Sequence, residues 1–167
     1  MDDESAQLLA CIPRLRRYAR ALAGDRAAAD DLVQDTLERA WRKMGSWRRG
    51  SDMRAWLFGI MHNLYIDHTR KRSRESAEEA VDELLSTRAS QSDRLEVRDL
   101  DAALRLLPSE QREVVLLVAI EEMTYDEVAK TLGIPPGTVM SRLARGREKL
   151  RAITEGRPLI SPLKVVK

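Results

Sequence analysis

Apolar residues in the first part of this chain recur at intervals of three and four, a spacing that places them on one face of an α-helix. Three such stripes follow one another. The first ends at Gly24, a residue type that readily closes a helix, and the others predict helices over about 28–43 and 52–71. Together they predict a compact amphipathic bundle. The stripes consist of Leu8, Ile12, Leu15, Ala19 and Leu22; of Val33, Leu37, Ala40 and Trp41; and of Trp56, Leu57, Ile60, Met61 and Leu64.

The same spacing returns near Leu95 and predicts a helix that ends at Pro108. Ser109 is expected to cap the helix that follows it. The apolar residues of the first of these helices are Leu100, Ala103, Leu104 and Leu107, and those expected to be buried in the second are Val114, Leu117 and Val118.

Residues 124–127 read Thr-Tyr-Asp-Glu and fit a capping box, in which the Thr and Glu side chains satisfy each other's backbone N–H groups. The helix that begins there buries Val128, Ala129 and Leu132 and should end at Gly133. Two prolines restrict the chain before a longer helix over about 137–152. A short helix, a tight glycine turn and a longer helix form the helix-turn-helix pattern.

Between these parts, residues 73–93 are rich in Ser, Glu and Ala and predict an acidic linker, with a short helical piece at 80–85. Residues 156–167 contain two prolines and predict a non-helical tail. The predicted fold is therefore all-α, with a helical bundle over 1–72 and a helix-turn-helix domain over 94–155, joined by a flexible linker.

Composition supports a soluble helical protein, since 43% of the 167 residues are hydrophobic and 34% are charged. No apolar run reaches the roughly 18 residues of a membrane span, and the first residues are acidic, so we expect a cytoplasmic protein without membrane insertion. The single cysteine, Cys11, is expected to be a small core residue. No zinc-binding spacing occurs, so neither a metal nor a cofactor is predicted.

The net charge of +2 hides a strong division along the chain. Residues 42–74 and 133–167 are basic, whereas the segments around them are acidic. Two basic blocks are typical of a protein that meets a polyanion at two places, although basic helix faces can also be merely solvated.

The longer helix of the helix-turn-helix has two faces. Val139, Leu143 and Leu150 are expected to pack inward. Arginine suits guanine edges, small hydroxyls permit close approach and lysine suits phosphates, so we interpret the outer face as that of a major-groove reader, although basic helix faces that are merely solvated are also common. Its residues are Thr138, Ser141, Arg142, Arg145 and Lys149.

The N-terminal bundle combines opposite charges. An acidic outer face follows residues 30–41, and a segment in which aromatic residues alternate with arginines comes next. Aromatic and cationic side chains together suit unstacked bases. Trp56 and Phe58 are expected to fill the core instead, whereas Trp47, in a loop, is expected to be more open.

Four motifs together resemble the extracytoplasmic-function group (group four) of the sigma-70 family. They are DLVQDTLERAW at 31–41, AWLFGIMHNLYIDHTRKR at 55–72, LPSEQREVVLL at 107–117 and MTYDEVAKTLGIPPGTVMSRLARGREKLR at 123–151. They occur in the order and spacing of that family. The resemblance implies a sigma factor that directs RNA polymerase to promoters and is not itself an enzyme.

The resemblance also implies partners and sites. The first motif would bind the clamp helices of core RNA polymerase, the second the −10 promoter element, and the C-terminal domain the −35 duplex and the polymerase flap. The linker would run toward the RNA exit path, and an anti-sigma factor would hold the free protein. The implied polymerase contacts are Asp31, Gln34, Asp35 and Glu38; the implied −10 contacts are Trp47, Asn63, Arg70 and Lys71.

Three alternatives make different predictions. A sigma-like module that only captures an anti-sigma factor would have lost its basic faces. A helix-turn-helix repressor would bind DNA without polymerase and would not need the motif at 31–41. An enzyme would need a phosphate loop, a metal cluster or a nucleophile beside His62 or His68, and the sequence contains none of these.

Overall fold

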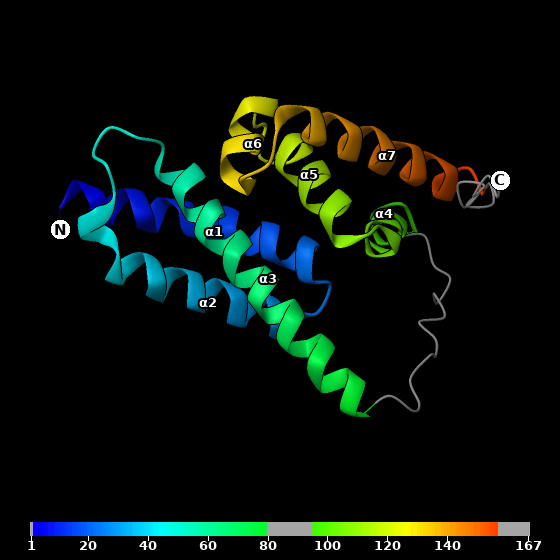
Figure 1. Cartoon of the computed structure of the whole chain (residues 1–167), viewed down its shortest axis with the longest axis horizontal. Helices are drawn as coiled ribbons and strands as arrows, with labels where there is room; N and C mark the ends of the chain where they lie inside the picture. Colours follow the sequence, from blue (N-terminus) through cyan, green and yellow to red (C-terminus); the bar gives the residue numbers. More distant parts are fainter. Residues whose placement is uncertain (1, 80–94, 157–167) are drawn as a thin grey trace. The chain divides into compact units, whose positions relative to one another are not determined.

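A computed structural model describes residues 2–79 and 95–156 of the chain (Figure 1), including side chains except those of 77–79 and 95–98. Every regular element within these ranges is a helix. The predicted all-α fold is therefore confirmed. The predicted helical piece at 80–85, the rest of the linker beyond residue 79 and the tail beyond residue 156 lie outside the described residues.

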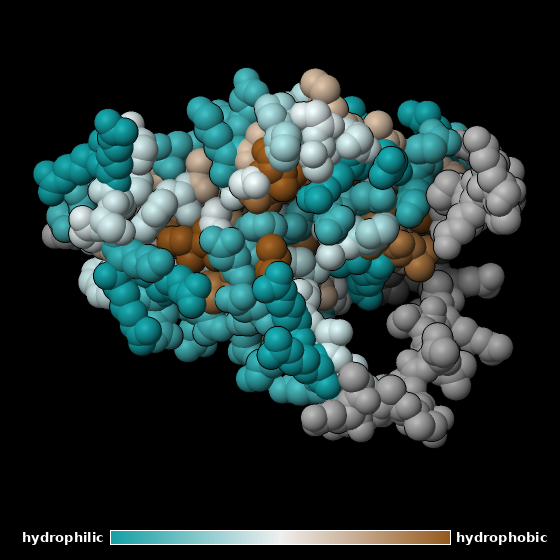
Figure 2. All heavy atoms as spheres, in the orientation of Figure 1, coloured by the Kyte–Doolittle hydropathy of each residue, from teal (hydrophilic) through white to brown (hydrophobic). Residues whose placement is uncertain are grey.

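The chain divides into two compact units. The first contains three α-helices, α1 (Asp3–Ala23), α2 (Arg26–Arg42) and α3 (Met53–Glu79), and a short 3-10 helix, η1 (Met44–Ser46). The second contains α4 (Leu95–Leu106), α5 (Ser109–Ala119), α7 (Pro136–Thr154) and most of α6 (Tyr125–Leu132). On the face drawn in Figure 2, hydrophilic residues predominate, and apolar atoms reach the surface only in separate areas.

The first unit is a three-helix bundle in which each helix contacts the other two. Tyr18 of α1 and Phe58 of α3 meet edge to face at its centre, with ring centroids 4.8 Å apart and an interplanar angle of 72°. This is a favourable aromatic arrangement, because the positive edge of one ring meets the negative face of the other. Both rings are almost fully buried, so the prediction that Phe58 fills the core is confirmed.

Local signals set the ends of α1 and α2. Asp2 accepts a hydrogen bond of 3.0 Å from the backbone N–H of Ser5, and hydrogen bonds from the Ser5 side chain and backbone hold the pKa of this carboxyl below its usual value. Gly24 ends α1 with φ 70° and donates its N–H to the carbonyl of Arg20. Asp25 then accepts from the N–H of Ala27 and begins α2. The chain therefore turns from α1 into α2 within two residues.

The third helix is longer than predicted. The apolar pattern predicts an end near Lys71, but α3 continues to Glu79. The first seven residues of the expected linker, 73–79, are therefore helical. Three of these seven residues are Glu, and one Ala and one Arg accompany them; all three residue types favour a helix, and neither Gly nor Pro interrupts the stretch. A solvated helix needs no apolar stripe, which explains why periodicity did not reveal it.

Several expectations about burial are wrong or only partly right. Trp41, predicted on the apolar side of its helix, is 63% exposed, because it lies in the last turn of α2. Leu100 of α4 is 49% exposed. Trp56 and Cys11 are half-buried and so only partly join the core.

In the second unit α4 and α5 both pack on α7. Val114 and Leu117 of α5 are buried as predicted, whereas Val118 is half-buried. Ser109 does not cap α5: Pro108 occupies the capping position, and no side chain bonds there. Proline suits this place because it has no N–H that would need a partner.

The carboxyl end of α4 is capped from α5. The Arg112 guanidinium donates to the carbonyl oxygens of Leu104 (2.8 Å), Arg105 (3.0 Å) and Leu107 (2.9 Å). The last carbonyls of a helix have no partner within the helix, so a cation that satisfies three of them also favours the negative end of the helix dipole. One side chain thus joins α4 to α5.

Candidate functional site

The acidic face predicted on α2 is accessible. Asp31, Gln34 and Glu38 are exposed, and Asp35 is half-buried. These residues follow one another at intervals of three, one and three, so they lie along one side of the helix. The structure therefore brings the four predicted polymerase contacts together on one surface.

Two of these acidic side chains have partners within the first unit. Asp35 lies 2.9 Å from the Nε2 atom of His68, so α2 and α3 are joined beside the acidic face. Glu38 pairs with Arg42 one turn further along α2. Pairs of this kind on a solvated surface stabilise by less than about 1 kcal/mol, so both carboxylates can exchange these partners for others.

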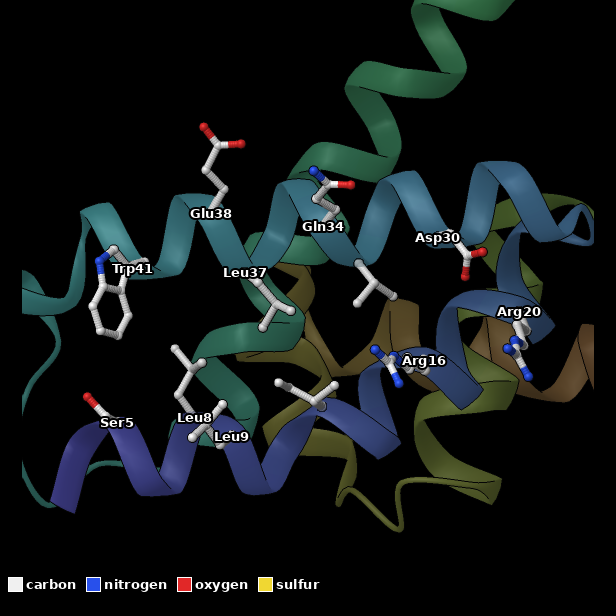
Figure 3. A pocket seen from close by; sticks show the side chains of 12 residues that line it. Ser5, Leu8, Leu9, Arg16, Arg20, Asp30, Gln34, Leu37, Glu38 and Trp41 are labelled. Carbon is white, nitrogen blue, oxygen red and sulfur yellow. The ribbon is translucent and has the colours of Figure 1, made fainter. Parts of the chain in front are cut away.

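An open groove of about 1130 Å³ lies between α1 and α2 (Figure 3). Apolar side chains line its middle, and Leu8, Leu9 and Leu37 lie between the two helices in this view. Trp41 stands at one end, and polar and charged residues form the borders. The lining residues are Ser5, Leu8, Leu9, Ile12, Arg16, Arg20, Asp30, Val33, Gln34, Leu37, Glu38 and Trp41.

Sequence reasoning did not find this groove. Leu9 is 49% exposed and lies one position beside the buried stripe of α1, and Trp41 is the other large exposed apolar residue of the groove. The sequence did carry one signal for the groove: the apolar stripe of α1 is wider than packing within the three-helix bundle requires. Gln34 and Glu38 belong both to the groove and to the predicted polymerase surface, so the two features form one continuous face.

On α3 the predicted −10 contacts Asn63, Arg70 and Lys71 are exposed. Intervals of seven and eight residues place them on one side of this helix. Arg70 and Lys71 line a shallow depression together with Asp67, Arg74 and Glu75. The basic charge of this surface is thus partly offset by two carboxylates.

Trp47 differs from the expectation that it lies in an open position. It follows η1 directly, and its side chain is only 7% exposed. The indole N–H is buried, and no hydrogen-bond acceptor from the described residues reaches it. A tryptophan removes a large apolar area from water, and this outweighs the cost of one unsatisfied N–H.

The helix-turn-helix is formed by α6 and α7. The predicted capping box is confirmed, because the Thr124 N–H donates to Glu127 at 2.9 Å and the Glu127 N–H donates to Thr124 Oγ1 at 3.2 Å. Gly133 follows α6 with φ 66°, a backbone conformation that glycine adopts without strain. Pro136 is the first residue of α7, as its fixed φ favours.

The two faces predicted for α7 are separate. Val139 and Leu143 are buried, and Leu150 is half-buried. Ser141 and Arg145 are exposed, and the other members of the predicted DNA face, Thr138, Arg142 and Lys149, are half-buried. The face is accessible, but its members differ in how far they project.

Arg142 is held toward α5. Its guanidinium lies 3.8 Å from the Glu110 carboxylate, and 27% of the side chain is exposed. Arg145, one turn further along α7, is exposed. The structure therefore distinguishes two arginines that the sequence made equivalent.

Comparison with known proteins agrees with this architecture. Residues 8–62 match the family model described as the Sigma2 domain of PhyR, and residues 98–150 match the model of sigma-70 region 4. The chain is 40% identical to the ECF RNA polymerase sigma factor EcfG of Rhodopseudomonas palustris over 87% of its own length and 82% of that protein. It is 35% identical to the ECF sigma factor SigL of Mycobacterium tuberculosis, with 82% and 80% covered.

Among solved structures, the sigma factor RpoE of Bartonella quintana, crystallised with the anti-sigma factor NepR, matches with a TM-score of 0.80 and 34% identity. The match covers 93% of this chain and 98% of RpoE. The two helical units, one with a helix-turn-helix, are thus those of a sigma factor of the sigma-70 type. The chain belongs to the extracytoplasmic-function sigma factors.

Across the described ranges, no helix combines the length and the apolar character that crossing a membrane would require.

Proposed function

We propose that this protein binds core RNA polymerase in the cytoplasm and directs it to promoters by reading the −35 duplex and capturing the −10 element. The first unit would bind the polymerase clamp and the −10 element. The second would bind the −35 duplex and the flap. Phosphodiester synthesis would belong to the polymerase. The observation that carries the proposal is the accessible, polar outer face of α7, with Ser141 and Arg145 exposed opposite a buried stripe.

Two surfaces of the first unit support the other half of the proposal. The acidic face of α2 continues into the apolar groove beside α1, which suits a protein partner, because charge guides the encounter and apolar area stabilises the complex. The exposed polar and basic side of α3 around Asn63, Arg70 and Lys71 suits the −10 element. Trp47 would have to leave its buried position before it could stack on a base.

Control by an anti-sigma factor is part of the proposal. RpoE of Bartonella quintana, which shares the fold over 93% of this chain, forms a complex with NepR. The groove and the acidic face of α2 offer this chain a comparable protein-binding surface. We infer that an anti-sigma factor competes with polymerase for it.

The deciding experiment is transcription from a supercoiled promoter library by core polymerase with and without the full chain. We expect a limited set of new transcripts that share −35 and −10 sequences. An unchanged transcript population would remove the proposal.

A second candidate is a sigma-like module that binds an anti-sigma factor but not DNA, as the match of residues 8–62 to the PhyR model allows. This candidate predicts capture of an anti-sigma factor and no new transcripts. A DNA-binding repressor instead predicts tight operator binding without polymerase. A module that does not bind DNA has no need of exposed basic residues on these helices. The exposure of Arg145, Arg70 and Lys71 therefore favours the sigma factor over the module that binds only an anti-sigma factor.

Replacing Arg145 by alanine should weaken discrimination at one −35 base pair by about 1 to 3 kcal/mol, because an exposed arginine can donate two hydrogen bonds to one guanine. Initiation by the reconstituted holoenzyme on templates with single −35 substitutions measures this. Arg105→Ala is the matched control, since Arg105 is exposed on α4 and pairs with Asp101 of the same helix, and its loss removes the same charge. An equal loss on all templates would make Arg145 a phosphate contact.

Replacing Asp31 by arginine should weaken the binding of core polymerase about tenfold, because like charges meeting at an interface cost several kcal/mol before side chains rearrange. Competition for a limiting amount of core polymerase against the unmodified chain measures the change. Glu155→Arg, at the exposed carboxyl end of α7, makes the same charge change away from the proposed surface. Equal affinities of the two variants would contradict the assignment of α2.

A further inference from the structure

An exposed methionine lies on α7, the second helix of the helix-turn-helix. Met140 is in the second turn of α7, and 52% of it is exposed. It is not one of the residues that the polar pattern of α7 marked as a DNA contact. Isolated apolar side chains on a surface need no special explanation, so the position of Met140 decides what it can do.

The buried residues of α7 define which direction faces outward. Successive residues of a helix are separated by about 100°, so Val139 and Leu143 each lie about 160° from Ser141. Both are buried, so Ser141 points directly away from the interior of the unit. Met140 and Arg142 then flank Ser141 at about 100° on either side.

Because Met140 and Arg142 flank Ser141 equally, the surface of α7 that is expected to contact base edges extends to both flanks. A helix that enters the major groove presents its outward side and both flanks to base edges, with its N-terminal residues closest to them. Arg142 is drawn toward Glu110, whereas Met140 is exposed. A helix that enters the groove with Ser141 at its centre therefore carries Met140 on one flank, as it carries Arg142 on the other.

The space around Met140 permits close approach of a DNA base. Gly137 and Ala144, three residues before and four after it, share its side of α7 and are both exposed. A methyl group added at Gly137 would meet no atom within 4 Å. Among the groups that base pairs present in the major groove, the 5-methyl of thymine is the apolar one, and it binds apolar side chains.

We propose that Met140 is a specificity-determining residue that contacts the 5-methyl group of a thymine in the −35 duplex. This rests on the proposed function, since it requires α7 to enter the major groove of that element. It adds an apolar contact to the hydrogen bonds expected from Ser141 and Arg145. Specificity at this position would come from the methyl group and not from a hydrogen bond.

The test uses holoenzyme reconstituted from core polymerase and the full chain, on a promoter obtained from the library experiment. Each thymine of the −35 element is replaced singly by deoxyuridine, which keeps every hydrogen bond but lacks the methyl group. We expect initiation at limiting holoenzyme to fall about fourfold at one position, the effect of one buried methyl-sized group. Met140→Ala should initiate equally on both templates at that position.

Two further variants separate a contact from a general defect. Met140→Leu retains an apolar side chain and should retain part of the deoxyuridine effect. Leu106→Ala removes an apolar side chain that is 61% exposed on α4 and should leave the effect unchanged. Two results would overturn the inference while leaving the sigma-factor function intact. In one, no single deoxyuridine substitution changes initiation; in the other, the deoxyuridine effect persists in Met140→Ala. The absence of any promoter-specific initiation would overturn both.

Discussion

Replacing Gly146 by leucine is expected to unfold the second unit. Gly146 is buried where α7 crosses α5, and a β-carbon placed there would lie 2.8 Å from Val115 Cγ2 and 3.5 Å from Gln111 Cβ. Val115 is itself buried and β-branched, so it cannot turn away without strain. Overpacking by a few methylenes costs about 1 to 3 kcal/mol and a larger clash costs more, so a leucine that clashes with buried Val115 can offset the roughly 3 to 5 kcal/mol that stabilises so small a helical unit.

Amide hydrogen exchange in the full chain measures this effect, because it reports on each helix separately. Protection should be lost in α5 and α7 of Gly146→Leu and retained in α1 and α2. Gly137→Ala is the matched control on the same helix. Its β-carbon meets nothing, and helix propensity favours alanine by about 1 kcal/mol, so protection should be kept or increased. Native protection in Gly146→Leu would show that α5 can move aside.

Replacing Arg112 by methionine should lower the stability of the second unit by about 2 to 4 kcal/mol. The change keeps an apolar side chain but removes the guanidinium that donates to three carbonyl oxygens at the end of α4. Charge-assisted hydrogen bonds contribute about 1.5 to 3 kcal/mol each, and partial exposure to water reduces the total. Urea unfolding followed by exchange of the α4 and α5 amides gives the change in free energy.

Arg105→Met is the control for this prediction. The Arg105 side chain pairs with Asp101 on its own helix at a solvated surface, so its replacement should cost about 0.5 kcal/mol or less. Arg112→Lys should remain destabilised, because a lysine ammonium cannot span three carbonyls as the planar guanidinium does. If Arg112→Lys were as stable as the unmodified chain, charge alone and not geometry would explain the cap.

Sequence reasoning predicted the local features well where a few neighbouring residues determine them. The hydrogen bonds between Thr124 and Glu127, and the left-handed Gly24 and Gly133, follow from capping chemistry that acts within one turn. The apolar pattern did not reveal the extension of α3 to Glu79, because helix propensity without an apolar stripe is hard to distinguish from a linker.

The candidate sites were predicted as sets of residues but not as surfaces. All predicted polymerase contacts on α2 and all predicted −10 contacts are at least partly exposed except Trp47, which follows η1 and is buried. The pairing of Asp35 with His68 joins residues that are 33 positions apart, and that of Arg142 with Glu110 joins residues 32 apart. Neither could be derived from spacing within one helix.

The sequence by itself determined where the helices lie apart from the extension of α3, the capping box at Thr124, the glycine ends of α1 and α6 and the charge of each outer face, because these depend on residues three or four positions apart. Tertiary packing decided that Trp47 is covered, that Trp41 borders a groove, that Arg112 caps α4 and that Met140 rather than Arg142 projects freely from α7. Each of these features depends on which distant segment of the chain packs against the side chain. Whether a residue is buried is therefore decided by its neighbours in space as much as by its own residue type.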